Sequence, residues 1–539
     1  MIGSQKSVSL FILTAGVIIG AWWWLGSGVL MPRSPLDPGE KLYCVSYAPF
    51  HGTQSPLDPA TFITSSQIDD DLAQLARIAD CVRTYSVDFG LDRVPEMARK
   101  HGLKVLLGVW LSSRTERNWS QMDTGIALAK NYPDVITAII VGNEALLRGE
   151  ISSADLADAL RNVKEKSKKP VTYADVWEFW LKHRELARVV DFVTIHILPY
   201  WEDIPIPAEQ AADHVASIRR IAANAFPGKE IVIGETGWPS AGRMREAALP
   251  SPAHQARALH DILARGKRDG FRVNLIEAYD QPWKRVLEGT VGGHWGLLDD
   301  ANRAFKFTWG EPVSNHPNWR RQATGGVALA AFVFLSGMLA RRRASDPSGI
   351  DRSADYLIAG NALVAGMLAG WAAENMLVES LGPGGWLRSL SLLAVAIAAP
   401  IVTAAALASK TALPSFDRVL ASAEDRIREP FALALGIVLI ALCVLSVQTA
   451  LGLVFDPRYR DLPFAPLTAA TVPFLLLSFR RMRPAGPRAI AELMSAAVLA
   501  LSAFYIAFNE SLANWQSLWL CVALLALAFI LARVRAAPG

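Results

Sequence analysis

Long apolar stretches dominate the second half of the chain and constrain its fold more than any other feature. From about residue 323 onward they recur, separated by short loops rich in arginine. A helix needs about 20 apolar residues to span the hydrocarbon core of a bilayer. Seven candidate spans lie near residues 322–340, 355–378, 388–408, 431–454, 465–479, 489–508 and 515–532. The fifth is short and contains Pro473, so it is the weakest candidate.

The N-terminus carries an eighth apolar stretch. Lys6 precedes an apolar run over residues 8–31, which is longer than the core of a signal peptide and lacks a clean small-residue cleavage pattern. We therefore predict a retained membrane anchor. The expected domains are an anchor and linker (1–39), a soluble domain (40–318) and a C-terminal domain of about seven transmembrane helices (319–539).

The short loops predict how these helices are oriented. One set of alternate loops and the C-terminal tail carry fourteen Lys and Arg residues, whereas the opposite loops carry only Arg388, Arg458 and Arg460. Positively charged loops stay in the cytoplasm. We predict cytoplasmic termini, and the lipid bilayer of a bacterial inner membrane as a partner of a periplasmic soluble domain. The fourteen are Arg341, Arg342, Arg343, Arg352, Lys410, Arg418, Arg426, Arg428, Arg480, Arg481, Arg483, Arg488, Arg533 and Arg535.

Net charge and cysteine content narrow the function. A net charge of +4 over 539 residues is small and is explained by these loops, so we expect no nucleic-acid partner. The four cysteines fit no zinc motif, and we predict neither a metal nor a cofactor. Cys44 and Cys81 fall on neighbouring predicted strands. A disulfide between them is one alternative, and the strain of a direct bridge across parallel strands argues for the other.

The soluble domain alternates short apolar runs with amphipathic helical patterns. The eight runs cover residues 42–48, 81–85, 103–110, 137–143, 171–173, 192–197, 230–234 and 273–278. Nearly continuous apolar runs are typical of parallel strands covered on both faces. A doubly wound open sheet would normally carry a phosphate-binding loop, and no Gly-x-Gly-x-x-Gly or Walker pattern occurs. We therefore predict an α/β protein: a (β/α)8 TIM barrel with an N-terminal anchor helix and an all-α transmembrane domain.

Two glutamates follow predicted strands at the end of the barrel that carries active sites. Glu144 follows the fourth strand in Val-Gly-Asn-Glu, and Glu235 follows the seventh in Ile-Gly-Glu-Thr-Gly-Trp-Pro-Ser. These strands face each other across the barrel mouth, so the two carboxyl groups can meet at a sugar. A retaining glycosidase needs two carboxyl groups about 5–5.5 Å apart. We predict that Glu144 and Glu235 are catalytic.

Several motifs resemble glycoside hydrolase family 17, the β-1,3-glucanase family. The main ones are Gly142-Asn143-Glu144 and Gly234-Glu235-Thr236-Gly237-Trp238-Pro239-Ser240. Further similar segments, in the same order as in the family, are Arg83-Thr84-Tyr85, His196 to Trp201, Glu277 to Lys284 and His294-Trp295-Gly296-Leu297. The resemblance covers roughly residues 42–308. The C-terminal spans resemble the bacterial membrane-bound branch, described as β-glucan synthases or glucanosyltransferases that form β-1,6 or β-1,3 linkages.

The resemblance implies roles for individual residues. Glu144 would be the acid/base, Glu235 the nucleophile, and Asn143 would bind the sugar 2-hydroxyl. Arg83 would keep Glu235 ionised, and Tyr200 would hold its carboxylate in place. The other predicted substrate-binding residues are Tyr85, His196, Trp201, Trp238, Glu277, Tyr279, Trp283, Lys284 and Trp295. For the tryptophans, stacking on glucose and filling of the barrel core are the two alternatives.

The predicted function is a retaining β-glucan glucanosyltransferase that acts on β-1,3-glucan outside the cytoplasmic membrane. It would introduce branches or β-1,6 or β-1,3 linkages during periplasmic glucan synthesis, with a glucan synthase in the same membrane as a candidate partner. A β-1,3-glucan hydrolase and a glucan-binding or export protein are the alternatives. Two catalytic carboxyl groups favour an enzyme. A synthase using a cytoplasmic nucleotide sugar would need a larger cytoplasmic domain than the loops provide.

Overall fold

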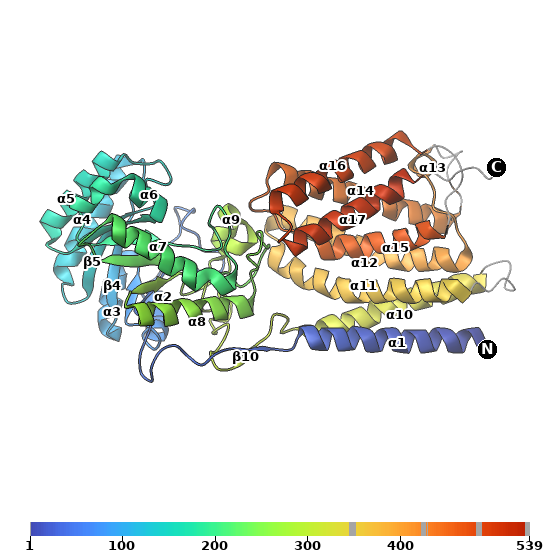
Figure 1. Cartoon of the computed structure of the whole chain (residues 1–539), viewed down its shortest axis with the longest axis horizontal. Helices are drawn as coiled ribbons and strands as arrows, with labels where there is room; N and C mark the ends of the chain where they lie inside the picture. Colours follow the sequence, from blue (N-terminus) through green and yellow to red (C-terminus); the bar gives the residue numbers. More distant parts are fainter. Residues whose placement is uncertain (1, 344–351, 422–426, 428, 481–487, 534–539) are drawn as a thin grey trace. The chain divides into compact units, whose positions relative to one another are not determined.

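The chain divides into two compact units, shown in Figure 1, a cartoon of the computed structural model. The structure describes residues 2–343, 352–421, 427, 429–480 and 488–533. The barrel unit is Val29–Val313, and the helical unit combines Met1–Gly28 with Ser314–Gly539. The N-terminal helix therefore packs with the C-terminal helices, as part of one bundle.

Eight parallel strands close the predicted barrel, and each coincides with one of the eight predicted runs. They are β2 (Cys44–Ser46), β3 (Cys81–Arg83), β4 (Lys104–Val109), β5 (Ile136–Asn143), β6 (Val171–Val176), β7 (Val193–His196), β8 (Ile231–Thr236) and β9 (Val273–Leu275). The larger helices between and after them are α2 (Ser65–Leu75), α3 (Val94–His101), α4 (Thr115–Asn131), α5 (Ser153–Ser167), α6 (Trp177–Lys182), α7 (Ala211–Ala225), α8 (Pro252–Asp269) and α9 (Arg285–Gly292). A short antiparallel pair, β1 (Val29–Leu30) with β10 (Pro312–Val313), joins the two ends of the unit.

The apolar pattern of each segment explains its place in the barrel. All six residues of β8 are buried, as expected for a strand with helices on one face and the barrel interior on the other. Helix α2 instead buries one stripe, including Ile68, Leu72 and Leu75. Its N-cap is Thr64, whose side chain accepts a hydrogen bond from the backbone N–H of Gln67.

A disulfide joins Cys44 of β2 to Cys81 of β3, with their Cα atoms 4.3 Å apart. Both residues belong to a buried cluster that also includes Leu106, Ala138 and Ile140 from the next two strands. The sequence left two alternatives for this pair, and the structure selects the bridge. Stable disulfides are typical of proteins outside the cytoplasm.

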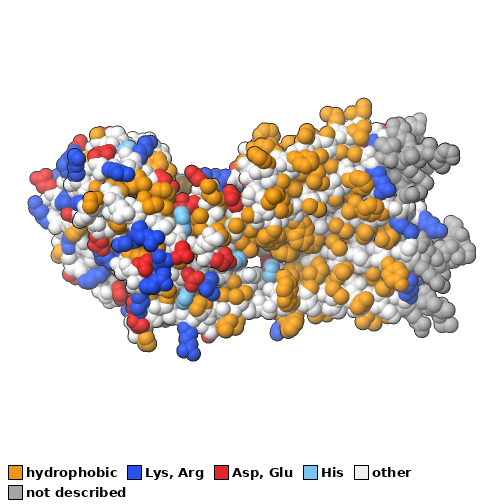
Figure 2. All heavy atoms as spheres, in the orientation of Figure 1, with side chains coloured by type: hydrophobic (Ala, Val, Ile, Leu, Met, Phe, Trp, Pro, Cys, Tyr) orange, Lys and Arg blue, Asp and Glu red, His pale blue; other side chains and the backbone are white. Residues whose placement is uncertain are grey.

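Within the described residues, the helical unit contains eight apolar helices of at least 16 residues. They are α1 (Ile2–Leu25), α10 (Trp319–Arg343), α11 (Arg352–Glu379), α12 (Gly382–Ser409), α14 (Pro430–Phe455), α15 (Phe464–Phe479), α16 (Ile490–Glu510) and α17 (Trp515–Ala532), with the short α13 (Phe416–Val419) before α14. Seven are long and apolar enough to cross a membrane, and α15 is the shorter one. Figure 2 shows hydrophobic side chains over most of the visible face of this unit.

Helix α15, the weakest predicted span, lies inside the bundle. Most of its 16 residues are buried. At its start the Phe464 ring lies 5.4 Å from that of Trp515, the first residue of α17. At its end the Ser478 carbonyl accepts a hydrogen bond of 2.8 Å from Arg533, just after α17. Helix α15 therefore runs alongside α17 over its whole length, even though it is short.

Several predicted cytoplasmic charges gather at one end of the bundle. Asp355 of α11 binds both Arg341 at the end of α10 and Lys6 of α1. Arg480, after α15, donates to Ser353 on α11. The ends of four helices that should face the same side are thus joined by polar contacts. Five of the fourteen charges lie outside the described residues: Arg426, Arg428, Arg481, Arg483 and Arg535.

Candidate active site

The turn after β5 carries Glu144. Gly142 has a φ of +87°, and a Cβ there would lie 3.2 Å from the Tyr173 ring, so glycine is needed at this position. Glu144 itself has a φ of +50°. A non-glycine residue in this left-handed region costs on the order of 1–3 kcal/mol, and such residues cluster at active sites. The conformation turns Asn143 and Glu144 towards the barrel mouth.

Glu235 lies within β8, one residue before its end. The register between β7 and β8 shifts between Ile195 and His196, and that between β8 and β9 shifts near Thr236. Irregularities of this kind redirect side chains next to active sites. The preceding residue must be small, because a Cβ at Gly234 would lie 2.4 Å from Thr194 and 3.2 Å from His196.

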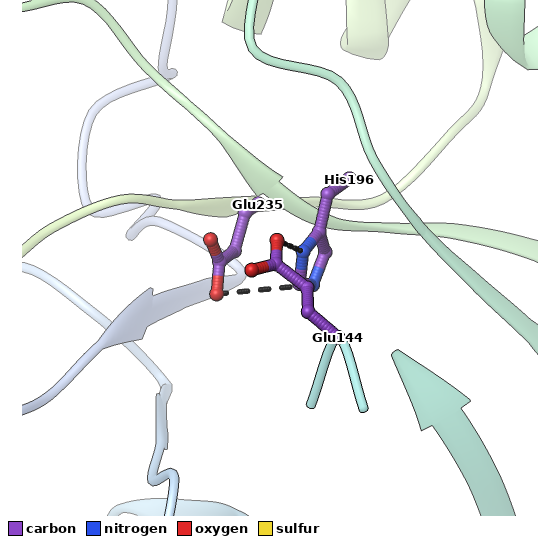
Figure 3. Close-up of side chains that lie close together, drawn as sticks. All are labelled: Glu144, His196 and Glu235. Atoms are coloured by element: carbon purple, nitrogen blue, oxygen red, sulfur yellow. Dashed lines mark hydrogen bonds and ion pairs between the residues drawn. The ribbon is translucent and has the colours of Figure 1, made fainter. Parts of the chain in front are cut away.

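His196 contacts both glutamates, as Figure 3 shows. Its Nδ1 is 2.7 Å from Oε1 of Glu144, and its Nε2 is 3.7 Å from Oε1 of Glu235. One ligand atom of each of the three residues lies within 4.8 Å of the other two. Two carboxyl groups this close have the spacing of a retaining glycosidase, rather than the wider gap that an inverting enzyme needs for a water molecule.

Arg83 links the two main motifs from the end of β3. Its Nη1 donates to Oε1 of Glu235 at 2.7 Å, and its Nη2 donates to Oδ1 of Asn143. The guanidinium group lies 3.8 Å from the centroid of the Tyr85 ring and is almost fully buried. The predicted contact between Arg83 and Glu235 is confirmed.

The charges around Glu235 favour its ionised form. Burial raises the pKa of Glu235, but the positive charges of His196, Arg83 and Lys284 outweigh burial and lower it below its ordinary value. For His196, burial lowers the pKa, but the carboxylates of Glu235 and Glu144 outweigh it and raise the pKa. The centre therefore holds an ionised carboxylate at Glu235 beside a histidine that favours its cationic form.

Glu277 and Lys284 form a second polar pair near Glu235. Nζ of Lys284 donates to Oε1 of Glu277 at 2.9 Å. Burial raises the pKa of Glu277 to about 7, although Lys284 opposes this shift. The other carboxyl oxygen of Glu277 is buried and has no hydrogen-bond partner among the described residues.

Four predicted binding residues are instead part of the core. The Tyr200 hydroxyl donates to the backbone carbonyl of Arg243 at 2.9 Å, and its role in holding Glu235 stays a prediction. Trp238, Tyr279 and Trp295 are at most 2% exposed and cannot stack on a sugar. All four belong to one hydrophobic core cluster, and the rings of Trp238 and Trp295 each pack edge-on against that of Tyr200.

Trp201 and Trp283 are partly exposed and remain candidates for stacking. The Trp201 ring packs edge-on against Tyr200, with centroids 4.9 Å apart. Trp283 donates from its indole nitrogen to Gln281 at 2.7 Å, which fixes the orientation of its ring. Of the four tryptophans predicted to stack on glucose, these two are exposed enough to do so.

Asp175, which is buried, and Glu288, which is partly buried, are acidic residues that the sequence-based prediction missed. The predicted sixth strand ended at residue 173, but β6 continues to Val176, which places Asp175 at the active end of the barrel. Burial raises the pKa of Asp175 to about 6; hydrogen bonding to Tyr173 opposes this, and the charge of Glu144 adds to it. Burial also raises the pKa of Glu288 on α9. A predicted sixth strand that extended to residue 176 would have placed Asp175 at the active end of the barrel.

The spacing of Glu144, His196 and Glu235 would also suit a metal ion, since each offers one ligand atom. Arg83 already forms an ion pair with Glu235, and Lys284 adds a second positive charge nearby. A cation at this place would be repelled by both. The charges around the three residues therefore disfavour a metal ion at this place.

Comparison with known proteins agrees with this geometry. Residues 44–296 match the BtgE/BtgC glycoside hydrolase domain. The barrel therefore resembles a glycoside hydrolase domain over most of its length. It is 30% identical over 228 residues to "Probable beta-glucosidase btgE" of Aspergillus fumigatus, covering 41% of this chain and 40% of that protein. It is 27% identical over 297 residues to "Probable glucan endo-1,3-beta-glucosidase btgC" of Aspergillus clavatus, covering 48% of this chain and 41% of that protein.

The chain thus spans about two fifths of the length of the curated relatives it matches. These relatives are fungal and do not support the bacterial branch that the sequence suggested. Among solved structures, the glycoside hydrolase domain resembles a β-1,3-glucanosyltransferase of Rhizomucor miehei in complex with laminaritriose. That likeness has a TM-score of 0.44 at 25% identity and covers 49% of this chain and 95% of the other. An endo-laminarinase from Formosa follows with a TM-score of 0.42 at 17% identity, covering 51% of this chain and 92% of the other.

Proposed function

We propose that the glycoside hydrolase domain cleaves β-glucan with retention of configuration and transfers the released glycosyl group to another sugar. The observation that carries this proposal is the proximity of the two carboxyl groups, with one oxygen of each within 4.8 Å of the other. Glu235, whose pKa is lowered by its cationic neighbours, is the nucleophile, and Glu144 is the acid/base.

The reaction has two steps. Glu144 donates a proton to the glycosidic oxygen while Glu235 attacks the anomeric carbon, so that the leaving sugar departs and a glycosyl ester forms on Glu235. Glu144, now ionised, then takes a proton from an incoming hydroxyl, which displaces the Glu235 carboxylate. Asn143, fixed by Arg83, supports the first step by binding the sugar 2-hydroxyl.

The proposed substrate is β-1,3-glucan. Support comes from the motifs around Glu144 and Glu235 and from the printed name of the btgC relative, a probable glucan endo-1,3-beta-glucosidase. Lys284, whose side chain is 13% exposed and pairs with the buried Glu277, supplies a polar contact for a further hydroxyl group. Trp201 and Trp283 supply partly exposed ring faces.

Transfer is favoured over hydrolysis if the acceptor sugar is bound next to the glycosyl ester. Well-oriented groups reach effective molarities on the order of 10⁵ M, which exceeds the concentration of bulk water. The apolar helices also support a membrane-tethered enzyme, which suits the remodelling of an exported polymer, including the introduction of β-1,6 or β-1,3 branches. A glucan synthase in the same membrane is the corresponding partner.

A product analysis tests this function. Full-length protein in detergent is incubated with laminari-oligosaccharides, and the products are measured by mass spectrometry and linkage analysis, with Glu235→Gln as the inactive control. We expect products longer than the donor. Only shorter products at millimolar acceptor would make the protein a β-1,3-glucan hydrolase, and no turnover at all would contradict both activities.

We further propose that the glycoside hydrolase domain lies outside the cytoplasm and that both termini lie inside. The charge ratio of fourteen to three, the contacts joining Lys6, Arg341 and Asp355, and the disulfide support this orientation independently. In a bacterial inner membrane the domain would be periplasmic. Reporter fusions after Asn318 and after Arg343 should report opposite sides of the membrane, and equal signals would reject the orientation.

A further inference from the structure

The turn that carries Glu144 is held by two buried side chains of the neighbouring strand β6. The backbone N–H of Leu146 donates to the Tyr173 hydroxyl oxygen at 2.8 Å, and the N–H of Leu147 donates to Oδ2 of Asp175 at 3.4 Å. The Tyr173 hydroxyl in turn donates to the same Asp175 oxygen. The backbone N–H groups of Leu146 and Leu147 therefore both donate to one tyrosine–aspartate pair.

This pair also contacts the turn from its other side. The Tyr173 ring packs against Gly142, where a Cβ would lie 3.2 Å away. Tyr173 thus touches the residues that precede and follow Glu144. The second oxygen of Asp175, Oδ1, accepts the N–H of Val176 at 2.8 Å, so both oxygens of its carboxylate accept hydrogen bonds.

Neither side chain can touch a sugar, because Tyr173 is 1% and Asp175 0% exposed. The charged groups that face the pair are Glu144 in the turn, Arg148 after it and His196 on β7. Any effect of the pair on the reaction must therefore pass through Glu144 and its turn, or through His196.

We propose that Tyr173 and Asp175 are positioning residues that hold the acid/base Glu144 in its left-handed conformation and fix the direction of its carboxyl group. The proposal rests on the proposed function of Glu144. Without the pair, two backbone N–H groups lose their partners and the strained φ of +50° at Glu144 can relax. Glu235, which lies on β8 and is held by Arg83, should stay in place.

The proposal predicts which steps fail. Protonation of the leaving sugar and activation of the acceptor need Glu144, whereas attack by Glu235 does not. A donor with a dinitrophenyl leaving group departs without a proton, and azide attacks the glycosyl ester without a base. With this donor and this acceptor, the reaction bypasses Glu144, and dinitrophenolate leaves as the β-glycosyl azide forms.

The test compares Tyr173→Phe with wild type in the full-length protein. Phenylalanine keeps the ring that packs on Gly142 and removes both hydrogen bonds of the hydroxyl. Because small displacements of a catalytic group cost about 10²-fold, we expect kcat on laminari-oligosaccharides to fall by about that factor. With dinitrophenyl β-laminaribioside and azide, turnover should stay within about twofold of wild type, which is far less than this loss.

Tyr47→Phe is the matched control. Tyr47 is also fully buried, and its hydroxyl donates to a buried aspartate, Asp71, at 2.9 Å. Its loss should affect both donors equally and only slightly. Asp175→Asn is the second variant. It keeps one acceptor oxygen for Tyr173 at nearly constant volume and replaces the other oxygen by an amide nitrogen. The decrease in kcat of this variant should also be confined to the oligosaccharide donor.

The outcomes separate the two proposals. Unchanged kcat of Tyr173→Phe and Asp175→Asn on oligosaccharides would overturn the positioning role while leaving the proposed function intact. Equal losses on both donors, without rescue by azide, would also overturn it, since they indicate a general structural defect. A wild-type protein that turns over neither donor would overturn the proposed function and this inference with it.

Discussion

The two carboxyl groups that we propose as catalytic lie in contrasting surroundings. Glu235 lies within a strand, its side chain is 6% exposed, and a buried guanidinium holds it by charge. Glu144 lies in a turn, its side chain is 24% exposed, and backbone hydrogen bonds to a neighbouring strand hold its turn. The difference matches the two roles, because a nucleophile must stay ionised and fixed, whereas an acid/base must exchange its proton in each cycle.

His196 is the contact that the two surroundings share. It bonds to Glu144 and lies close to Glu235, and it is itself fully buried. Proton movement at Glu144 therefore changes the charge next to Glu235. The two groups are best tested separately, with substrates that need one and not the other.

The largest effect is expected from loss of the nucleophile. Glu235→Gln should lower kcat by roughly 10⁴-fold or more on every donor, because no glycosyl ester can form. Glu235→Ala with azide should give a glycosyl azide of inverted configuration, identified by NMR. Substantial activity of Glu235→Gln after deamidation has been excluded by mass spectrometry would reject the assignment.

Loss of the acid/base should be selective. Glu144→Gln should lower kcat on laminari-oligosaccharides by about 10²–10⁴-fold, the usual contribution of general acid–base catalysis. With a dinitrophenyl donor and azide it should regain most of its activity and give a glycosyl azide of retained configuration. An inverted azide from this variant would exchange the roles of Glu144 and Glu235.

Removal of Arg83 should shift the pH dependence. Its positive charge helps to lower the pKa of Glu235, so Arg83→Gln should raise that pKa. Because Glu235 must be ionised to attack, the acid limb of kcat/KM should move to higher pH. Arg83→Lys, which keeps the charge, is the control and should shift the limb less. An acid limb that does not move in Arg83→Gln would show that Arg83 does not control the ionisation of Glu235.

The sequence predicted the fold well because each strand and helix has a local pattern. The runs over residues 137–143 and 230–234 are apolar and end at glycine-containing motifs, so both glutamates could be placed at the active end of the barrel. The helices of the helical unit followed from the length and apolar composition of their segments. Each of these predictions uses the sequence of a single segment and needs no knowledge of its neighbours in space.

The rest depends on contacts between segments. The burial of Trp238 and Trp295 depends on their packing against Tyr200, which the sequence does not reveal, and their residue type is equally suited to a sugar site. The disulfide depends on the approach of two strands. Asp175 was missed because Ala174 to Val176 were not recognised as strand residues.

The smallest effect is expected at Tyr200, and it tests whether charge alone holds Glu235. The Tyr200 hydroxyl donates to the Arg243 carbonyl, and its ring packs against Trp201 and Trp238. Tyr200→Phe keeps this packing and removes one hydrogen bond, which is worth about 1 kcal/mol. We therefore expect a small decrease in melting temperature. The kcat should stay within about threefold of wild type, a factor that corresponds to less than 1 kcal/mol. The acid limb of kcat/KM should not move. A shifted acid limb in this variant, comparable to that of Arg83→Gln, would mean that the hydroxyl turns to Glu235 when substrate binds, and the nucleophile would then depend on hydrogen bonding as much as the acid/base does.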